Sequence, residues 1–294
     1  LLCCRQFLPA GERSAMATDC EFDVEDVEYA RPGGAPLLAR LYKPKGAGPF
    51  PGVVEVHGGA WTANDRLANE AIHRPLAAAG VVVMAIDFRM PPTAQYPASI
   101  VDINLAMRWL KAHAGELRVA PEKVGIVGTS SGGHQAMLAA MRPRDKRYAA
   151  AALMSDAAVD ASAAYVALCW SIVDPLARFR MVSGNGNQRL VDAHNAYWPS
   201  EEAMAEGNPQ MILERGEPAA LPPCLLIQGT SDDNVTPDMA DRFDAAYRAA
   251  GGDFTLEKFP GAPHAFVAKD PASDDSRRAV GLIRDFVLAK AAAV

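Results

Sequence analysis

The feature that most constrains this chain is the segment 124–133, which reads Val-Gly-Ile-Val-Gly-Thr-Ser-Ser-Gly-Gly. The apolar residues up to Val127 predict a buried strand, and the alanine-rich stretch after the glycines predicts a helix. Between them lies Ser130, with Gly128 two residues before it and Gly132 two residues after it. In such a G-x-S-x-G turn the backbone passes so close to itself that flanking side chains would collide. We therefore expect a strained turn that exposes the Ser130 hydroxyl.

Ser131 is the alternative nucleophile, but Thr129 would then stand where the preceding glycine is needed, so the spacing selects Ser130. By itself the motif is also compatible with a tight strand-to-helix turn that has no chemical role. Two nucleotide-binding patterns are excluded. The glycines do not follow G-x-G-x-x-G, and no lysine follows them as a phosphate-binding loop requires.

A second predicted strand, 53–56, ends in His57-Gly58-Gly59. Attack on a carbonyl builds negative charge on its oxygen, and fixed backbone N–H groups stabilise that charge best where water is excluded. Because glycines let the backbone come this close, we predict an oxyanion hole formed by the N–H groups of Gly58, Gly59 and Ser131. The simpler interpretation is a turn that ends the strand.

A serine nucleophile needs a base, and His264 is the strongest candidate among the six histidines. It lies in a loop between the predicted strand 254–259 and the last predicted helix, 273–289. His134, four residues after Ser130, stays a minor candidate. The other histidines fall in predicted helices, in an irregular segment or in the segment His57-Gly58-Gly59, called the glycine turn below.

The acid that orients this base should also follow a strand, and the predicted strand 224–228 runs into Gly-Thr-Ser-Asp-Asp-Asn-Val. Asp232 is the better of two adjacent candidates, the other being Asp233. Taken alone, an Asp-Asp pair in a polar loop is more often turn chemistry than catalysis. The chain order Ser130, Asp232, His264 favours catalysis, since serine hydrolases built on a strand-turn-helix nucleophile use this order.

Together these segments resemble the α/β-hydrolase family, in particular its His-Gly-Gly carboxylesterases, which include acetyl-esterase-like and hormone-sensitive-lipase-like members. The resemblance covers most of residues 35–290. The segment 87–92, Asp-Phe-Arg-Met-Pro-Pro, is similar to D-Y-R-x-x-P, and 97–110 is similar to the helix that leads to the nucleophile. The acid loop is similar to G-x-x-D-x-x-V, which implies that Asp232 is the acid and that Asp233 is solvated or caps a helix.

The acid loop lacks the D-P-L-x-D segment that is usual in hormone-sensitive-lipase-like members. The chain is therefore more similar to the smaller esterases, the acetylxylan or feruloyl esterases and aryl formamidases. Its segment 57–61, His-Gly-Gly-Ala-Trp, also resembles H-G-G-x-W of kynurenine formamidases. The resemblance implies a serine carboxylic-ester hydrolase that cleaves small, short-acyl or aryl esters through an acyl-enzyme. An aryl formamidase and a non-catalytic binding protein of the same fold are the alternatives.

Predicted strands alternate with helical patterns along the chain, at 53–56, 81–86, 124–127, 149–153, 225–228 and 254–259. Such alternation predicts an α/β protein with a mostly parallel central sheet and helices on both faces, as in the α/β-hydrolase fold. The segments 24–29 and 37–42 predict an antiparallel hairpin at the sheet edge. We expect one domain over 21–294. At about 156–221 no further strand is predicted over a stretch too long for an ordinary connection, so we expect a helical lid insertion there. Residues 1–20 are expected to be poorly ordered or to derive from cloning.

We predict that four aromatic side chains bind substrate, namely Trp61, His57, Trp170 and Tyr165. Trp61 directly follows the predicted oxyanion glycines, so its ring is expected near the leaving group. Trp170 and Tyr165 belong to the predicted insertion, whose aromatic residues could instead hold it against the sheet.

The predicted mechanism uses no metal and no cofactor. A net charge of −6 without a basic run argues against nucleic acid or an anionic membrane surface as a partner. No apolar segment reaches the length of a membrane span. The expected partner is a small-molecule ester. The sequence does not decide whether the chain forms a homodimer. Five cysteines without C-x-x-C spacing predict reduced thiols in a cytoplasmic enzyme.

Overall fold

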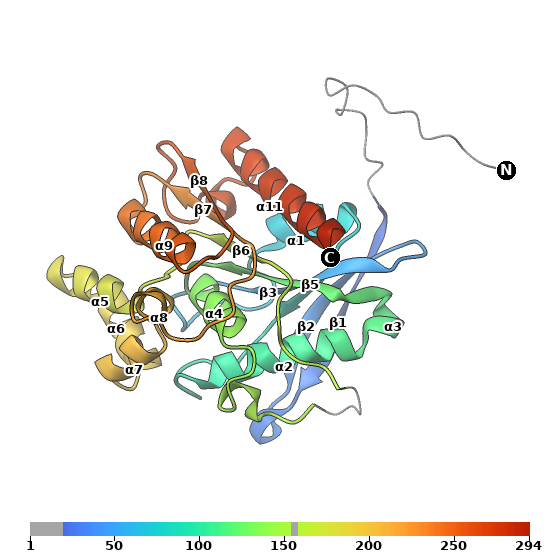
Figure 1. Cartoon of the computed structure of the whole chain (residues 1–294), viewed down its shortest axis with the longest axis horizontal. Coiled ribbons are helices and arrows are strands. Elements are labelled where there is room, and N and C mark those ends of the chain that lie inside the picture. Colours follow the sequence, from blue (N-terminus) through green and yellow to red (C-terminus); the bar gives the residue numbers. More distant parts are fainter. Residues whose placement is uncertain (1–19, 154–157) are drawn as a thin grey trace.

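The computed structural model describes residues 20–153 and 158–294, and within these residues its centre is an eight-stranded sheet (Figure 1). The strand order is β1-β2-β4-β3-β5-β6-β7-β8. β2 pairs antiparallel with both β1 and β4, and the pairs from β4 to β8 are parallel. The predicted hairpin and the mostly parallel sheet are therefore confirmed. Of the predicted N-terminal segment, residues 1–19 lie outside the described residues.

The strands follow the sequence patterns that predicted most of them. They are β1 Phe22–Ala30, β2 Leu37–Pro44, β3 Phe50–Val56, β4 Val82–Ile86, β5 Val119–Thr129, β6 Val166–Cys169, β7 Cys224–Gly229 and β8 Phe254–Phe259. All residues of β4 and β7 are buried, as expected for parallel strands covered on both faces. The edge strand β1 instead carries charges, and its Asp26 pairs with Arg40 across the hairpin at 2.9 Å. Charged side chains on an edge discourage pairing with another strand.

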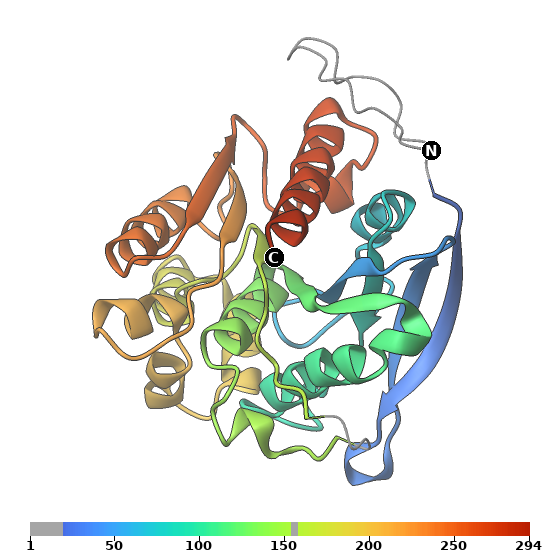
Figure 2. The ribbon, with the colours of Figure 1, turned by 45° about the vertical axis from the view of Figure 1, so that its right-hand side comes forward.

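Helices cover both faces of the sheet (Figure 2). One face is covered by α1 Glu70–Ala78 and α11 Asp274–Ala293, and the other by α2 Ala98–Ala112, α4 Ser130–Met141 and α9 Pro237–Ala249. Shorter elements are α3 Ala114–Leu117, α10 Phe266–Lys269 and the 3₁₀ helices η1 Pro32–Gly34 and η2 Tyr148–Ala150. Among the helices of the described residues, none combines the length and the apolar character needed to cross a bilayer.

The predicted strand 149–153 is wrong. Its first residues belong to η2, and the sheet is continued by β6, which pairs with β5 and β7 inside the region predicted as an insertion. All four residues of β6 are fully buried, so this short apolar run has no alternation to mark it as a strand. The helical insertion begins only after β6 and comprises α5 Pro175–Gly184, α6 Gln188–Tyr197, α7 Glu201–Glu206 and α8 Pro209–Glu214.

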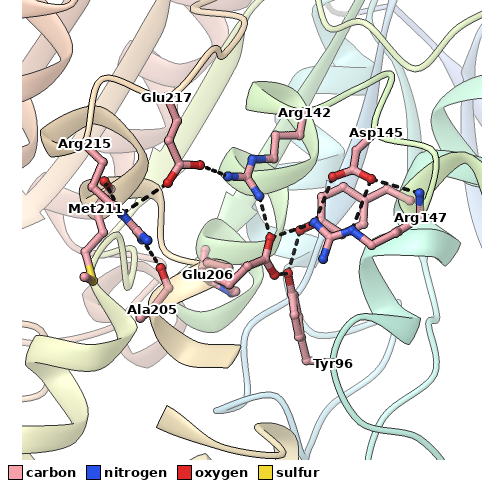
Figure 3. Close-up of polar contacts among 12 residues, drawn as sticks. Tyr96, Arg142, Asp145, Arg147, Ala205, Glu206, Met211, Arg215 and Glu217 are labelled. Atoms are coloured by element: carbon pink, nitrogen blue, oxygen red, sulfur yellow. Dashed lines mark hydrogen bonds and ion pairs between the residues drawn. The ribbon is translucent and has the colours of Figure 1, made fainter. Parts of the chain in front are cut away.

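An ion-pair network joins the helical insertion to the rest of the fold (Figure 3). Glu206, the last residue of α7, accepts hydrogen bonds from Arg142 at 2.6 Å and Arg147 at 2.7 Å, both of which follow α4. The Tyr96 hydroxyl also donates to this carboxylate. The other terminal nitrogen of Arg142, Nη2, donates to the carboxylate of Glu217. The two guanidinium groups thus share the Glu206 carboxylate, which fixes α7 against the end of α4.

We expect Glu206→Gln to lower the free energy of unfolding by about 1 kcal/mol, because it removes the charge that two arginines share. The Glu206 side chain is 35% exposed, so solvent screening keeps the effect modest. For a chain of this size the melting temperature should fall by about 2–4 °C. Calorimetry against Glu122→Gln, an exposed residue without an ion pair in the described residues, provides the control. Equal melting temperatures for the two variants would contradict this role.

Candidate active site

Ser130 lies at the junction of β5 and α4, in the strained turn that the sequence predicts. Its φ is 52°, in the left-handed region that residues with a Cβ rarely adopt. Glycine is required on both sides. A Cβ on Gly128 would lie 2.7 Å from the Gly132 oxygen, and one on Gly132 would lie 2.2 Å from the oxygens of Val56 and His57. The helix therefore packs directly on the end of β3, and Ser130 projects from the carboxyl edge of the sheet.

The three predicted catalytic side chains meet at this edge. The Ser130 hydroxyl lies 3.0 Å from Nε2 of His264, and Nδ1 of His264 lies 2.8 Å from Oδ2 of Asp232. These distances form a continuous hydrogen-bonded chain from hydroxyl to carboxylate. The imidazole follows β8 and the carboxylate follows β7, so both come from neighbouring parallel strands. The arrangement allows His264 to withdraw a proton from Ser130 while Asp232 holds the ring.

The structure also separates the two adjacent aspartates. Asp232 is 3% exposed, and its Oδ1 accepts backbone hydrogen bonds from Asn234 at 2.9 Å and Val235 at 2.8 Å. Gln228 approaches Oδ2 at 3.2 Å. Asp233 is exposed. The turn therefore directs Asp232 toward His264 and anchors it there.

The predicted oxyanion hole needs one correction. The N–H of Gly58 donates to Oγ1 of Thr129 at 3.0 Å, so it already has an acceptor. Within the described residues, the N–H groups of Gly59, Ala60 and Ser131 donate to no protein acceptor. Gly59 and Ala60 line the cavity at Ser130, so Ala60 joins Gly59 and Ser131 as a candidate oxyanion donor that the sequence did not single out. The Ser131 hydroxyl accepts a hydrogen bond from the backbone N–H of Trp61 at 3.1 Å. This bond connects the glycine turn to the start of α4.

A buried polar chain supports the glycine turn from below. Asn69 donates to Oγ1 of Thr129 at 3.0 Å and to Glu55 at 2.6 Å. Glu55, fully buried in β3, also accepts from Nε2 of His73 at 2.8 Å. Thr129, which bonds to Gly58, is thereby linked through Asn69 to a carboxylate inside the fold. A buried polar network of this kind holds a backbone segment in one position.

A cavity of about 260 Å³ opens beside Ser130 and His264. Trp170, one of the predicted substrate-binding residues, lines it and meets the His264 ring edge-on at 6.4 Å. The remaining wall comes from the glycine turn, the α1 region, the insertion and the two catalytic loops, through Gly58, Gly59, Ala60, Ala63, Asn64, Ala68, Asn69, Thr129, Arg178, Arg189, Leu190, Asn234, Ala265 and Ala268.

Three predicted substrate-binding residues lie outside this lining. Trp61 is 1% exposed and stacks on Tyr197 at 5.3 Å, so its ring supports the insertion instead of reaching the leaving group. His57 is buried against Phe88 with ring centroids 4.4 Å apart. Tyr165 donates to the carbonyl oxygen of Gly52 at the amino end of the sheet, opposite to Ser130. These predictions fail because nearness in sequence does not decide which way a side chain points.

The minor candidate His134 has a structural role beneath the insertion. Its Nδ1 accepts from Nε1 of Trp61 at 3.2 Å, and its Nε2 donates to the Gly207 oxygen at 2.8 Å. His194 accepts from Arg178 at 2.9 Å. Burial lowers the pKa of His134 to about 4, and burial together with the Arg178 charge lowers the pKa of His194 to about 3. Both rings are therefore neutral near pH 7.

We expect the free energy of unfolding to fall as the pH drops from about 6.5 toward 4. An unfolded histidine has a pKa near 6.5, so below that pH the unfolded chain binds protons that His134 and His194 exclude in the fold. Each can contribute up to about 1.4 kcal/mol per pH unit. Urea titrations at pH 7.5, 6.0 and 5.0 measure the slope. His134→Gln keeps an acceptor and a donor without titrating, so its slope should be shallower; an unchanged slope contradicts the assignment.

Two charged cavity residues, Arg178 and Arg189, carry no signal in the sequence. Both lie on helices of the insertion, and only the docking of that insertion decides what they face. Asn69 is equally unmarked, because it precedes α1 while its partners Glu55 and Thr129 lie on β3 and β5. The Ala60 N–H could have been proposed from the sequence, because it directly follows the N–H groups of Gly58 and Gly59 in the same turn.

The chain is similar in sequence to proteins named esterase and carboxylic ester hydrolase. The family model BD-FAE matches residues 40–247. Esterase LipC of Mycobacterium tuberculosis is 29% identical over 231 residues, which cover 76% of this chain and 55% of that protein. Carboxylic ester hydrolase LipN of the same organism is 35% identical over 126 residues, which cover 42% of this chain and 33% of that protein. The chain thus spans less than two thirds of the length of either relative.

Among solved structures, the fold is similar to that of a hyperthermophilic esterase from Pyrobaculum calidifontis. The TM-score is 0.74 and the identity 23%, over 92% of this chain and 86% of that one. Esterase 2 of Thermogutta terrifontis, solved with propionate bound, has a TM-score of 0.70 and the same identity, over 90% of this chain and 93% of that one. These similarities establish the predicted α/β-hydrolase fold.

Proposed function

We propose that this chain, which belongs to the BD-FAE family, is a serine carboxylic-ester hydrolase that cleaves small, short-acyl or aryl esters through an acyl-enzyme. The observation that carries the proposal is the hydrogen-bonded chain from Ser130 through His264 to Asp232 at the edge of a cavity. Relatives named esterase and carboxylic ester hydrolase support it. The cavity volume of about 260 Å³ favours small substrates.

In the proposed reaction, Nε2 of His264 takes the Ser130 proton as the serine oxygen attacks the ester carbonyl. Asp232 holds the imidazole in the tautomer that has this nitrogen free. The N–H groups of Gly59, Ala60 and Ser131 stabilise the negative charge on the carbonyl oxygen. Imidazolium then protonates the leaving alcohol, and water, activated by the same imidazole, releases the acid from Ser130. These steps use only side chains and backbone of the chain.

Hydrolysis of p-nitrophenyl acetate, butyrate and octanoate tests the proposal, and we expect the two shorter esters to be preferred. Incubation with paraoxon should add one diethylphosphoryl group to Ser130, detected by mass spectrometry. Absence of both turnover and labelling would instead support the non-catalytic binding protein. The formamidase alternative rests on the segment that ends in Trp61, whose ring is buried beneath the insertion, so the motif does not favour a formamide over an ester.

We further propose that the enzyme works in a reducing compartment such as the cytoplasm. Cys20, Cys169 and Cys224 are free thiols in the described part of the chain, and the last two are fully buried. Burial raises the pKa of both buried thiols, which keeps them protonated and unreactive. A thiol titration of the protein, isolated from such a compartment and unfolded without a reducing agent, should then find every cysteine as a free thiol.

A further inference from the structure

The cavity beside Ser130 has an unbalanced positive charge. Arg178 and Arg189 belong to its wall, and no aspartate or glutamate does. This contrasts with the chain as a whole, whose net charge is −6. A cavity lined by charge of one sign raises the local concentration of ligands of the opposite sign.

Arg178 is the more unusual of the two, because it is fully buried. Its guanidinium donates to the carbonyl oxygen of Asn234 at 3.3 Å, to the amide oxygen of the same residue, and to Nε2 of His194 at 2.9 Å. It also lies 6.0 Å from the centre of the Trp61 ring. All these partners are neutral, and no carboxylate of the described residues lies within ion-pair distance. Burying a cation without an ion-pair partner is costly, so Arg178 gains more from an anion in the cavity than an exposed arginine would.

Arg189 adds a second positive charge at the same cavity. It is exposed in the first turn of α6, and within the described residues it forms no ion pair. The charge of Asp232 acts on Arg178 from a distance, but this carboxylate is bonded to His264, Asn234 and Val235, forms no ion pair with Arg178 and is not part of the cavity wall. An anion that enters the cavity would therefore meet two arginines and no competing acid on the wall.

We propose that Arg178 and Arg189 form a subsite for a carboxylate carried by the substrate, so that the preferred esters are anionic. This inference rests on the proposed esterase function and specifies its substrate class: monoesters of dicarboxylic acids, or acyl esters of hydroxy acids. The substrate carboxylate supplies a negative charge at the cavity wall, where Arg178 has no ion-pair partner among the described residues. Hydrogen bonds to charged groups contribute about 10- to 100-fold in affinity each, which sets the scale of the expected preference.

Matched ester pairs test the proposal with the carboxylate on either side of the scissile bond. The first pair is monoethyl glutarate and ethyl 5-methylhexanoate, in which an isopropyl group replaces the carboxylate. The second pair is 4-acetoxybenzoate and 4-acetoxybenzamide. A pH-stat follows acid release at low salt, because salt screens the attraction. In at least one pair we expect kcat/KM to be about tenfold or more higher for the anionic ester.

The same ratio is then measured in Arg178→Met, which keeps an unbranched, flexible stem but removes the guanidinium, and in Arg189→Gln, which changes an exposed residue. We expect the anionic-to-neutral ratio to fall about tenfold or more in each. If Arg178→Met does not fold, Arg189→Gln carries the test. Arg180→Gln is the matched control, because Arg180 lies on α5 together with Arg178, is exposed, and is absent from the cavity wall. Its ratio should equal that of the unmodified protein.

Neutral esters separate the two proposals. If they are hydrolysed but neither anionic ester is preferred, or if the preference survives in the arginine variants, the carboxylate subsite is wrong and the esterase assignment stands. If no ester in the panel is hydrolysed and paraoxon does not label Ser130, the esterase assignment itself is wrong.

Discussion

Replacing Ser130 by alanine will lower kcat for p-nitrophenyl acetate by about 10⁴- to 10⁶-fold, because the oxygen that attacks the carbonyl is gone. The residual rate comes from substrate binding and the oxyanion donors, which the change leaves in place. Alanine also has a Cβ, so the left-handed backbone at this position is no more strained than in the parent chain. The variant loses one hydrogen bond, to His264 at 3.0 Å, and should therefore keep nearly the same melting temperature.

Ser131→Ala is the matched control for the nucleophile. The change keeps the backbone N–H of the oxyanion hole and removes only the hydroxyl that accepts from the Trp61 N–H. Turnover should stay within about tenfold of the parent value, and Ser130→Ala should lose labelling by paraoxon while Ser131→Ala keeps it. Undiminished hydrolysis by a folded Ser130→Ala variant would falsify the assignment.

The second large effect is expected for Asp232→Asn, which should lower kcat by about 10⁴-fold. The carboxylate accepts from Nδ1 of His264 at 2.8 Å, which leaves Nε2 free to receive the Ser130 proton. An amide NH₂ at this position can donate to Nδ1 and thereby favour the tautomer in which Nε2 carries the hydrogen. The residue is buried and nearly isosteric with asparagine, so we expect a loss of turnover without loss of the fold.

Asp233→Asn provides the comparison, since it makes the same chemical change one residue away on an exposed side chain. Its kcat should remain within a few-fold of the parent value. Steady-state kinetics of the two variants over pH 6–9 measure both effects. The reverse pattern, with Asp233→Asn impaired and Asp232→Asn active, would mean that the acid is the other member of the pair.

Much of the fold was predictable because its signals are local. The apolar runs at β3, β4, β5 and β7 are long enough to distinguish strands from turns, and the structure confirms each of them and the more polar strand β8. β6 has no signal of its own, because four buried residues show no periodicity, and the apolar run at 149–153 predicts a strand that the structure does not contain. Whether such a short apolar run joins a sheet depends on the neighbouring strands that are free to pair with it.

The sequence by itself determined the strained turn at Ser130 and the order of serine, acid and histidine. Glycine is needed at fixed spacing around the turn, and parallel strands end at the same edge of a sheet, so residues that follow β5, β7 and β8 must lie there together. Tertiary structure alone decided which groups face the cavity. The N–H of Gly58 donates to Thr129 and is not free for a ligand. The Trp61 ring packs beneath the insertion, away from the cavity, whereas Arg178 lines the cavity. Such orientations depend on packing between distant segments, which no local pattern encodes.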